Sequence, residues 1–272
     1  MFLARVMVIA GSDSGGGAGL QADLMAVAVL GGRASTVVTV LTAQNSLGVQ
    51  GFWPVPPKFV AAQFRAVAND IGLDAVKTGI LPTAAHVVLV AELLAPLGAP
   101  LVVDPVLAAS TGQGLMEPAA LEVLKTRLLP LASLVTPNLA EAQALTGLNV
   151  QGPKVMARAA RVLVEMGARA ALVKGGHLAG EPVDVLFDGR REHYFSAPRL
   201  PNAHTHGTGC TLASALATLL ASGWELKAAV ERARLLVRRA IAAGLPLGAG
   251  RGPVRILADL EHRLKEAAAS IG

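Results

Sequence analysis

The fold is decided by residues 5–30, which read RVMVIA, then GSDSGGGAG, then LQADLMAVAVL. Residues 5–10 form a short apolar run, which is typical of a strand buried on both faces of a parallel sheet. The glycine-rich stretch 11–19 ends this run, and a helical pattern follows over residues 20–30. A strand, a loop and a helix in this order predict the first unit of an α/β fold.

The same alternation continues along the chain. Further apolar runs that predict strands are 36–42, 101–104, 133–136 and 170–174. Helical patterns lie at 59–69, 84–97, 121–128, 155–166, 208–222 and 226–243. Segments 183–187 and 192–196 flank Asp188 and Gly189, which predicts an antiparallel hairpin at one edge of the sheet. We therefore expect a three-layer α/β/α sandwich with a mostly parallel central sheet, formed by residues 1–272 as a single domain.

Composition excludes several classes of protein. A chain with 53% hydrophobic and 16% charged residues is not disordered. Only 3% of its residues are aromatic, which argues against a nucleic-acid stacking surface. The basic run Arg232, Arg234, Arg238 and Arg239 is interpreted as a solvated helix face. With one cysteine, Cys210, and no apolar run of about 18 residues, we expect a cytoplasmic protein without disulfides or membrane spans.

Ligands of open α/β sheets bind at the carboxyl ends of the strands, so the segments that follow each strand are the candidate site. Segment 11–19 loosely fits a dinucleotide-binding loop, but 42–45 supplies no acidic residue for a ribose, which argues against a nicotinamide enzyme. The chain has no P-loop motif either. Five glycines among residues 11–19 exceed what one turn requires, so we expect the backbone there to approach a small ligand closely.

Gly207, Thr208, Gly209 and Cys210 precede a predicted helix. Backbone N–H groups at a helix start are unpaired and carry the positive end of the helix dipole, so these residues predict an anion hole for a phosphoryl group. The alternative is a simple N-cap. The dipole is expected to lower the pKa of the Cys210 thiol, which would let it act as a base. A small buried hydrophobic residue is the alternative interpretation of Cys210.

Polar residues follow other strands. Asn138 and Glu141 lie in TPNLAE (136–141) at a helix start, where their spacing suits either the waters of a Mg²⁺ ion or a capping box. Asp104 ends a strand and serves either a metal or a turn. His177, His204 and His206 show no metal-ligand spacing and are interpreted as loop histidines.

Taken together, these segments resemble the ribokinase superfamily, and within it the hydroxymethylpyrimidine and hydroxymethylpyrimidine phosphate kinases. The similarity runs nearly end to end, and the motifs that carry it are AGSDSGGGAG (10–19), LTAQN (41–45), VKTG (76–79), VDPV (103–106), TPN (136–138), VKGGH (173–177) and HGTGCT (206–211). Most superfamily members have an aspartate base where this chain has Cys210. Two segments differ from the family pattern: Ser110, Thr111, Gly112 and Gln113 replace Lys-Ser-Gly-Asp, and Arg251 replaces a histidine within 250–253.

The resemblance implies an ATP- and Mg²⁺-dependent enzyme that works as a homodimer. It would phosphorylate 4-amino-5-hydroxymethyl-2-methylpyrimidine and then the monophosphate, giving the diphosphate for thiamin synthesis. Cys210 would be the base, within the anion hole Gly207–Cys210. The residues implied around the pyrimidine are Gln44, Asp23, Gly11, Ala18, Ile80 and Val106. On the nucleotide side they are Thr136, Asn138 and Lys174, with Glu141 and Asp104 toward the metal. The alternatives are a pyridoxine or pyridoxal kinase, and a non-catalytic protein that binds a vitamin precursor.

Overall fold

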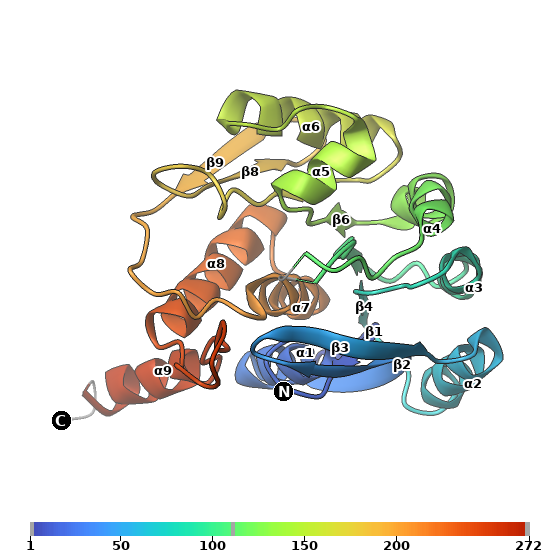
Figure 1. The fold of residues 1–272 in the computed structure, drawn as a ribbon, viewed down its shortest axis with the longest axis horizontal. Coiled ribbons are helices and arrows are strands. Elements are labelled where there is room, and N and C mark those ends of the chain that lie inside the picture. The colour runs from blue at the N-terminus through green and yellow to red at the C-terminus, as the bar shows by residue number, and fades with distance from the viewer. Residues whose placement is uncertain (1–2, 110–111, 270–272) are drawn as a thin grey trace.

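The computed structural model describes residues 3–109 and 112–269. Over these residues the strands form one nine-stranded sheet in the order β3-β2-β1-β4-β5-β6-β7-β8-β9 (Figure 1). The strands are β1 (Arg5–Asp13), β2 (Arg33–Asn45), β3 (Gly48–Pro54), β4 (Ala75–Thr78), β5 (Leu101–Val103), β6 (Leu134–Val135), β7 (Ala171–Val173), β8 (Val183–Phe187) and β9 (Glu192–Ser196). The α-helices are α1 (Gly19–Val29), α2 (Pro57–Ala68), α3 (Ala84–Leu94), α4 (Pro118–Val123), α5 (Leu139–Thr146), α6 (Pro153–Glu165), α7 (Thr208–Ala221), α8 (Leu226–Ala242) and α9 (Ala258–Ala269). A short π-helix, η1 (Leu124–Leu128), and a short 3₁₀-helix, η2 (Leu129–Leu131), continue α4.

The sheet confirms the predicted architecture. In the centre of the sheet the strands β2, β1, β4, β5, β6 and β7 lie side by side in this order, and each pairs in parallel with the next. At one edge β8 and β9 form the predicted antiparallel hairpin. The opposite edge was not predicted: β3 turns back along β2 as a second antiparallel strand. The sequence signal for β3 is weak because GVQGFWP (48–54) contains two glycines and a proline, which are depleted in strands.

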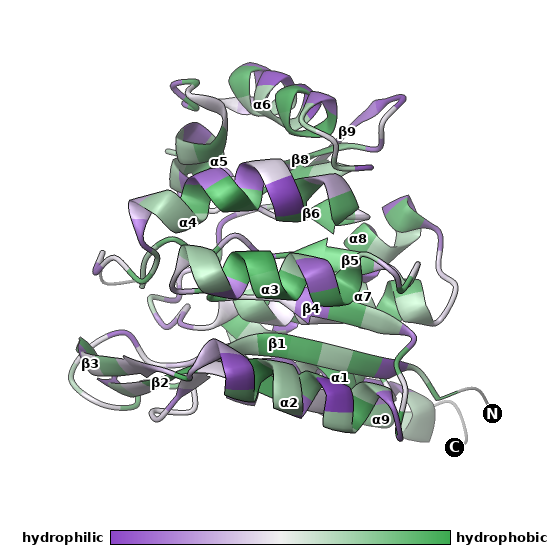
Figure 2. Ribbon diagram, turned by 90° about the vertical axis from the view of Figure 1, so that its right-hand side faces the viewer, coloured by the Kyte–Doolittle hydropathy of each residue, from purple (hydrophilic) through white to green (hydrophobic). Residues whose placement is uncertain are grey.

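Helices cover both faces of the sheet, and β1 shows how the strands serve both layers. Its side chains alternate, so that Val6 and Val8 belong to the core cluster that includes residues of α1, α7 and α8, whereas Met7 and Ile9 belong to the cluster that includes residues of α2, α3 and α6. Figure 2 shows β1 hydrophobic along most of its length. None of the helices in the described part of the chain combines the length and apolar character that crossing a membrane requires.

The basic run in α8 is not the solvated face that we predicted. Arg232 and Arg239 donate hydrogen bonds to the carboxylate of Asp259, which is fully buried at the start of α9. Arg234 pairs with Asp184 of β8 at 2.7 Å and lies over the ring of Phe195. These arginines therefore attach α9 and the edge hairpin to α8. For Arg232 and Arg239 the interpretation failed because helix α9, which carries their partner Asp259, was not predicted.

Candidate active site

The start of α7 meets the carboxyl ends of the central parallel strands. Gly207 is the N-cap of α7 and no side chain in the described residues caps this helix end. The Cα of Gly209, in the first turn, faces an ion pair: a methyl group built there would lie 3.3 Å from Lys174 Nζ and 3.7 Å from Asp104 Oδ2. The helix start thus lies beside residues that follow β5 and β7, as expected for ligand sites of open α/β sheets.

The first glycine-rich loop packs against this helix start. A methyl group built on Gly207 would lie 1.9 Å from the carbonyl oxygen of Gly17, and one built on Gly17 would lie 2.4 Å from the His206 ring. Within the loop, a methyl group on Gly19 would lie 2.4 Å from the carbonyl oxygen of Gly11. For these glycines the closely approaching group is another part of the protein. The predicted approach of the loop to a ligand stays a prediction.

A buried ion pair lies beneath α7. Lys77 Nζ, at the end of β4, donates hydrogen bonds to both carboxylate oxygens of Asp23 at 2.9 Å, and Ser214 Oγ donates to Oδ1 at 2.7 Å. Both charged residues are fully buried. Burial alone would lower the pKa of Lys77, but Asp23 holds that pKa above its ordinary value, so the amine stays charged.

The Asp23 carboxylate is held by Lys77 and Ser214, which the sequence did not predict. Both of its carboxylate oxygens are engaged by groups of the protein, so its implied contact with the pyrimidine ring remains a prediction. Lys77 lies in the VKTG motif (76–79), for which we predicted no function of the lysine. Its signal was a lysine inside an otherwise apolar strand, where a charge requires a buried partner.

The expected low pKa of Cys210 is wrong for this structure. Desolvation of the partly buried thiol raises its pKa to about 12, and Asp23 and Asp104 act in the same direction. Lys77 and the N–H of Gly19 lower the pKa but do not outweigh burial. The thiol is therefore neutral near pH 7, because burial and two nearby carboxylates disfavour the thiolate more than the helix start favours it.

Asp104 and Glu141 flank Lys174. The ammonium group of Lys174 lies 2.9 Å from Asp104 Oδ1 and 4.0 Å from Glu141 Oε2, and Thr136 Oγ1 donates to Asp104 Oδ1 at 3.3 Å. Burial raises the pKa of Glu141 to about 7, although Lys174 opposes this shift. Lys174 is thus brought together with the two residues that were predicted to face the metal.

Asn138 and Glu141 form the capping box that was one of our two interpretations. Asn138 Oδ1 accepts from the Glu141 N–H at 2.9 Å, and Glu141 Oε2 accepts from the Asn138 N–H at 2.7 Å. The box does not exclude the other interpretation, because it uses only one carboxylate oxygen of Glu141. Across the described residues, no group of three or more His, Cys, Asp or Glu side chains could hold a metal. Two carboxylates fit a Mg²⁺ ion that is held mainly by water and phosphate oxygens.

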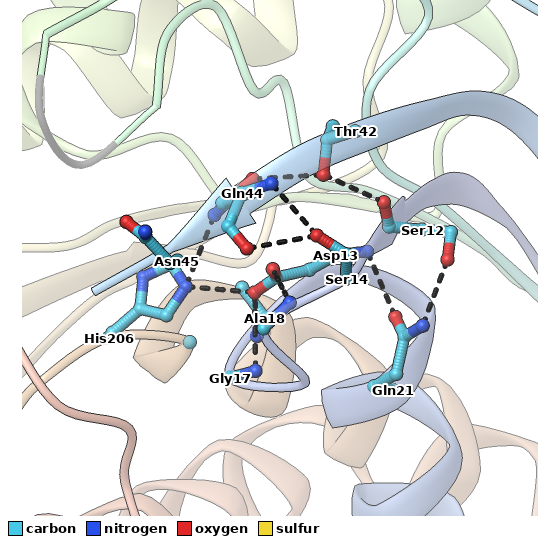
Figure 3. A network of polar contacts seen from close by, with 12 residues as sticks. Ser12, Asp13, Ser14, Gly17, Ala18, Gln21, Thr42, Gln44, Asn45 and His206 are labelled. Atoms are coloured by element: carbon cyan, nitrogen blue, oxygen red, sulfur yellow. Dashed lines mark hydrogen bonds and ion pairs between the residues drawn. The ribbon is translucent and has the colours of Figure 1, made fainter. Parts of the chain in front are cut away.

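Gln44 belongs to a polar network that joins β2 to the first loop and to α7 (Figure 3). Its side-chain Nε2 lies 3.3 Å from His206 Nε2, which in turn lies 2.9 Å from Asp13 Oδ2. Its backbone N–H donates to Ser14 Oγ at 2.8 Å. Our interpretation of His206 as a mere loop histidine missed this position. The available signal was its place directly before the Gly-Thr-Gly-Cys segment.

The other implied ring contacts are partly brought together. Gly11 lies at a bulge in β1, and a methyl group built on it would lie 3.3 Å from the side chain of Ile80. Ala18 precedes α1 and donates its N–H to Asp13 at 2.8 Å. Val106 follows β5, where its N–H donates to the carbonyl oxygen of Asp104 at 2.9 Å.

Of the segments that differ from the family pattern, Ser110 and Thr111 lie outside the described residues. The Arg251 N–H donates to the carbonyl oxygen of Ser46 at 3.1 Å, and Pro253 forms a bridge with His206. The segment 250–253 therefore connects the turn after β2 to the residue that precedes the helix start.

Comparison with known proteins decides the family. A family model described as phosphomethylpyrimidine kinase matches residues 13–255. The chain belongs to the phosphomethylpyrimidine kinase family. It is 55% identical over 249 residues to a hydroxymethylpyrimidine/phosphomethylpyrimidine kinase of Streptomyces coelicolor, covering 92% of this chain and 93% of that protein.

Solved structures agree with a kinase of this family. An ADP complex of pyridoxal kinase from Bacillus subtilis superposes with a TM-score of 0.89 at 34% identity, covering 94% of this chain and 98% of that one. A phosphomethylpyrimidine kinase from Clostridium difficile superposes with a TM-score of 0.78 at 36% identity, covering 88% and 99%. These matches confirm the predicted ribokinase-like fold, and membership of a kinase family excludes a non-catalytic binding protein.

Proposed function

We propose that this protein uses ATP to phosphorylate 4-amino-5-hydroxymethyl-2-methylpyrimidine and then its monophosphate, forming the diphosphate used in thiamin synthesis. The observation that carries the proposal is the uncapped start of α7 beside the Lys174–Asp104 ion pair. N–H groups at a helix start and a lysine together suit a phosphoryl group in transfer. The pyrimidine substrate follows from the relative in Streptomyces coelicolor, which is named for both reactions.

On the phosphoryl side, the N–H groups of Gly207, Thr208, Gly209 and Cys210 would form the anion hole. Thr136, Asn138 and Lys174 would lie toward the nucleotide. Asp104 and Glu141 would hold Mg²⁺, chiefly through its waters. When bound, the ion would neutralise charge on the phosphate oxygens. Glu141 can serve in this way only when it is ionised, so its raised pKa of about 7 links the proposal to pH.

On the substrate side, Gln44 would recognise the aminopyrimidine edge with the donor and acceptor of its amide. Gly11, Ala18, Ile80 and Val106 would surround the ring, with Asp23 at its base. Cys210, in its thiolate form, would accept the proton of the hydroxymethyl group during the first phosphorylation. In the second phosphorylation the attacking atom is a phosphate oxygen of the monophosphate. Since the second pKa of a phosphate monoester is about 6, that oxygen needs no base at pH 8.

The test is ADP release by the purified protein with ATP, Mg²⁺ and either the pyrimidine alcohol or its monophosphate. We expect turnover with both substrates. Assays without Mg²⁺, and with thiamin in place of the pyrimidine, are the controls. Absence of turnover with both pyrimidines would refute the proposal.

Pyridoxal kinase activity is a second candidate, favoured by the TM-score of 0.89 to the Bacillus subtilis pyridoxal kinase. Pyridoxal also carries a hydroxymethyl group on an aromatic nitrogen ring, so both alcohols suit the same phosphoryl machinery. The ratio of kcat/KM for the pyrimidine alcohol to that for pyridoxal separates the two. A ratio below one would make pyridoxal the principal substrate.

We further propose that residues 1–272 act as one cytoplasmic domain and that the active form is a homodimer. The edge strand β3 and its neighbourhood support a dimer, because Leu47, Trp53 and Phe59 are each more than 60% exposed. Light scattering on the wild type and on Trp53→Ser tests this. We expect a dimer for the wild type and a larger monomer fraction for the variant, and a monomeric wild type would refute it.

A further inference from the structure

His206 is held in place by its backbone. Its N–H donates to the carbonyl oxygen of Gly252 at 3.2 Å, and its own carbonyl oxygen accepts from the Val254 N–H at 3.1 Å. The side chain is only 12% exposed, and its ring packs against Gly17. The position of ring atom Nε2 is therefore fixed by contacts that do not involve Gln44.

Asp13 decides where the His206 proton lies. Its carboxylate accepts hydrogen bonds from the N–H groups of Gly15, Gly17 and Ala18. Burial alone would raise the pKa of Asp13, but His206 and the N–H groups of Gly15 and Ala18 lower it below its ordinary value. An ionised carboxylate can only accept hydrogen bonds. Since His206 Nε2 lies 2.9 Å from Asp13 Oδ2, that nitrogen must carry a proton.

Thr42 constrains the other side of the Gln44 amide. Thr42 Oγ1 donates its single proton to the carbonyl oxygen of Ser12 at 2.9 Å, so toward other groups it can only accept. Its distance to Gln44 Oε1 is 3.3 Å, and Gln44 Nε2 lies 3.3 Å from His206 Nε2 (Figure 3). In that orientation two acceptors, Thr42 Oγ1 and Gln44 Oε1, face each other. Two donors, Gln44 Nε2 and His206 Nε2, also face each other.

Half a turn of the amide removes both mismatches. Oxygen and nitrogen of a glutamine amide are nearly the same size, and their assignment follows from the hydrogen-bond network. With the NH₂ group toward Thr42 and the oxygen toward His206, the amide donates to Thr42 Oγ1, and its oxygen shares the single His206 Nε2–H with Asp13 Oδ2 in a three-centre hydrogen bond. No other atom has to move.

We propose that His206 is a positioning residue that fixes the orientation of the Gln44 amide and thereby the direction in which the substrate ring binds. This inference rests on the proposed function, in which Gln44 recognises the ring. Gln44 would then offer its second N–H on the Thr42 side and its second oxygen lone pair on the His206 side. A 4-aminopyrimidine matches this order, because a ring nitrogen lies directly beside its amino group. In pyridoxal a methyl-bearing carbon separates the ring nitrogen from the hydroxyl group, so one amide cannot bind both side by side.

The kinetic test compares His206→Leu, which removes the donor, with His206→Gln, whose side-chain nitrogen can replace Nε2. For His206→Leu we expect KM for the pyrimidine alcohol to rise about tenfold, the scale of one lost hydrogen bond, with kcat and the KM for ATP within about threefold of the wild type. His206→Gln should restore most of the KM. His262→Leu on α9, an exposed histidine, is the matched control and should behave as wild type.

A double-mutant cycle with Gln44→Leu tests whether His206 acts through Gln44. If it does, His206→Leu adds little to the KM of the Gln44→Leu variant. Independent, multiplicative effects would overturn the inference, as would a fall in kcat with unchanged KM. A wild type that does not turn over the pyrimidine alcohol would refute the proposed function instead.

The position of the proton can be measured without any substrate. In wild-type protein with ¹⁵N-labelled histidine, NMR should show His206 Nε2 protonated at pH 7.5. An unprotonated Nε2 would overturn the inference. Because this measurement needs no variant, it decides the question even if His206→Leu does not fold.

Discussion

Gly207 contacts Gly17 through backbone alone: a methyl group built on Gly207 would lie 1.9 Å from the Gly17 carbonyl oxygen. Gly207 also has φ of +88°, a conformation that favours glycine. This contact joins the start of α7 to the loop that carries Asp13. It therefore fixes the proposed anion hole relative to the network around Gln44.

We predict that Gly207→Ala destabilises the fold. The left-handed backbone alone costs a residue with a side chain about 1–2 kcal/mol, and the clash with Gly17 adds to that cost. The melting temperature should fall by at least about 5 °C, which calorimetry measures. Gly223→Ala is the matched control, since Gly223 has φ of +80° but no atom near its added methyl group. Equal losses in the two variants would show that the contact with Gly17 contributes nothing.

Gly209→Ala, in contrast to Gly207→Ala, should lower activity without lowering stability. Gly209 lies in the first turn of α7, where alanine is a better helix former than glycine, and the nearest atom to its methyl group is the flexible end of Lys174 at 3.3 Å. Stability should therefore be kept, whereas the methyl group obstructs the helix N–H groups. We expect kcat to fall at least about 10²-fold, the scale of losing one such donor. A folded variant with normal kcat would place phosphoryl transfer elsewhere.

Much of the fold follows from local sequence. The alternation of short apolar runs with helical patterns predicted the parallel centre of the sheet apart from the four-residue strand β4, and Asp188-Gly189 predicted one edge hairpin. Strand β3 and helix α9 were missed because their stability comes from distant partners. β3 pairs along β2, and α9 is attached through the buried carboxylate of Asp259 to arginines of α8.

The sequence predicted which loops form the candidate site, but not the pKa values and long-range partners of its side chains. The Gly-Thr-Gly-Cys segment predicted a helix start, and TPNLAE (136–141) predicted a cap, which the structure confirms. The pKa of Cys210 depends on burial and on Asp23 and Asp104, which are far away in sequence. His206 likewise gains its partner Asp13 only when the chain folds, so no local pattern could have identified either relationship.

Glu141→Gln removes the charge of Glu141 but keeps a side chain that can complete the capping box with Asn138. Glutamine at this position preserves a capping box, so the fold should persist. Because the folded pKa of about 7 exceeds the ordinary value of 4.5, ionising Glu141 as pH rises between these values costs folding free energy. The variant should therefore be at least as stable as wild type at pH 8. If Glu141 holds the metal, kcat should fall at least about tenfold and more Mg²⁺ should be required.

The same carboxyl group predicts the pH dependence of the wild type. Protonation of Glu141 below about pH 7 should lower kcat for both phosphorylations, and raising the pH through 7 should restore it. Rates measured from pH 5.5 to 8 with each substrate check this. A rate that is constant below pH 7, or a Gln variant with wild-type kcat, would remove Glu141 from the metal site.

Lys77→Met tests the buried ion pair. Removing the lysine leaves the Asp23 carboxylate buried without its charge partner, which typically costs about 3–5 kcal/mol. The melting temperature should fall by about 10 °C. The double variant Lys77→Met/Asp23→Leu removes both charges and should regain most of this loss. If the double variant is no more stable than the single one, the cost lies in packing and not in the unpaired charge.

Cys210→Ala distinguishes the two phosphorylations. In the first, the neutral alcohol must lose a proton during attack, so a positioned base contributes about 10²–10⁴-fold. In the second, a phosphate oxygen with a pKa of about 6 is already unprotonated at pH 8. The variant should therefore lose at least about 10²-fold in the first reaction and much less in the second. Small, equal losses in both would identify Cys210 as a packing residue.

The pKa of Cys210 adds a pH dependence to this prediction. A thiol with a pKa of about 12 is almost entirely protonated at pH 8, and its thiolate fraction rises tenfold with each pH unit. If the thiolate is the base, kcat for the alcohol should rise about tenfold from pH 8 to 9, while kcat for the monophosphate stays nearly constant. In Cys210→Ala the rise should disappear. A flat profile for the alcohol in the wild type would mean that substrate binding lowers the thiol pKa below 8 or that another group takes the proton. Thiol titration of the protein with bound pyrimidine alcohol separates these two outcomes.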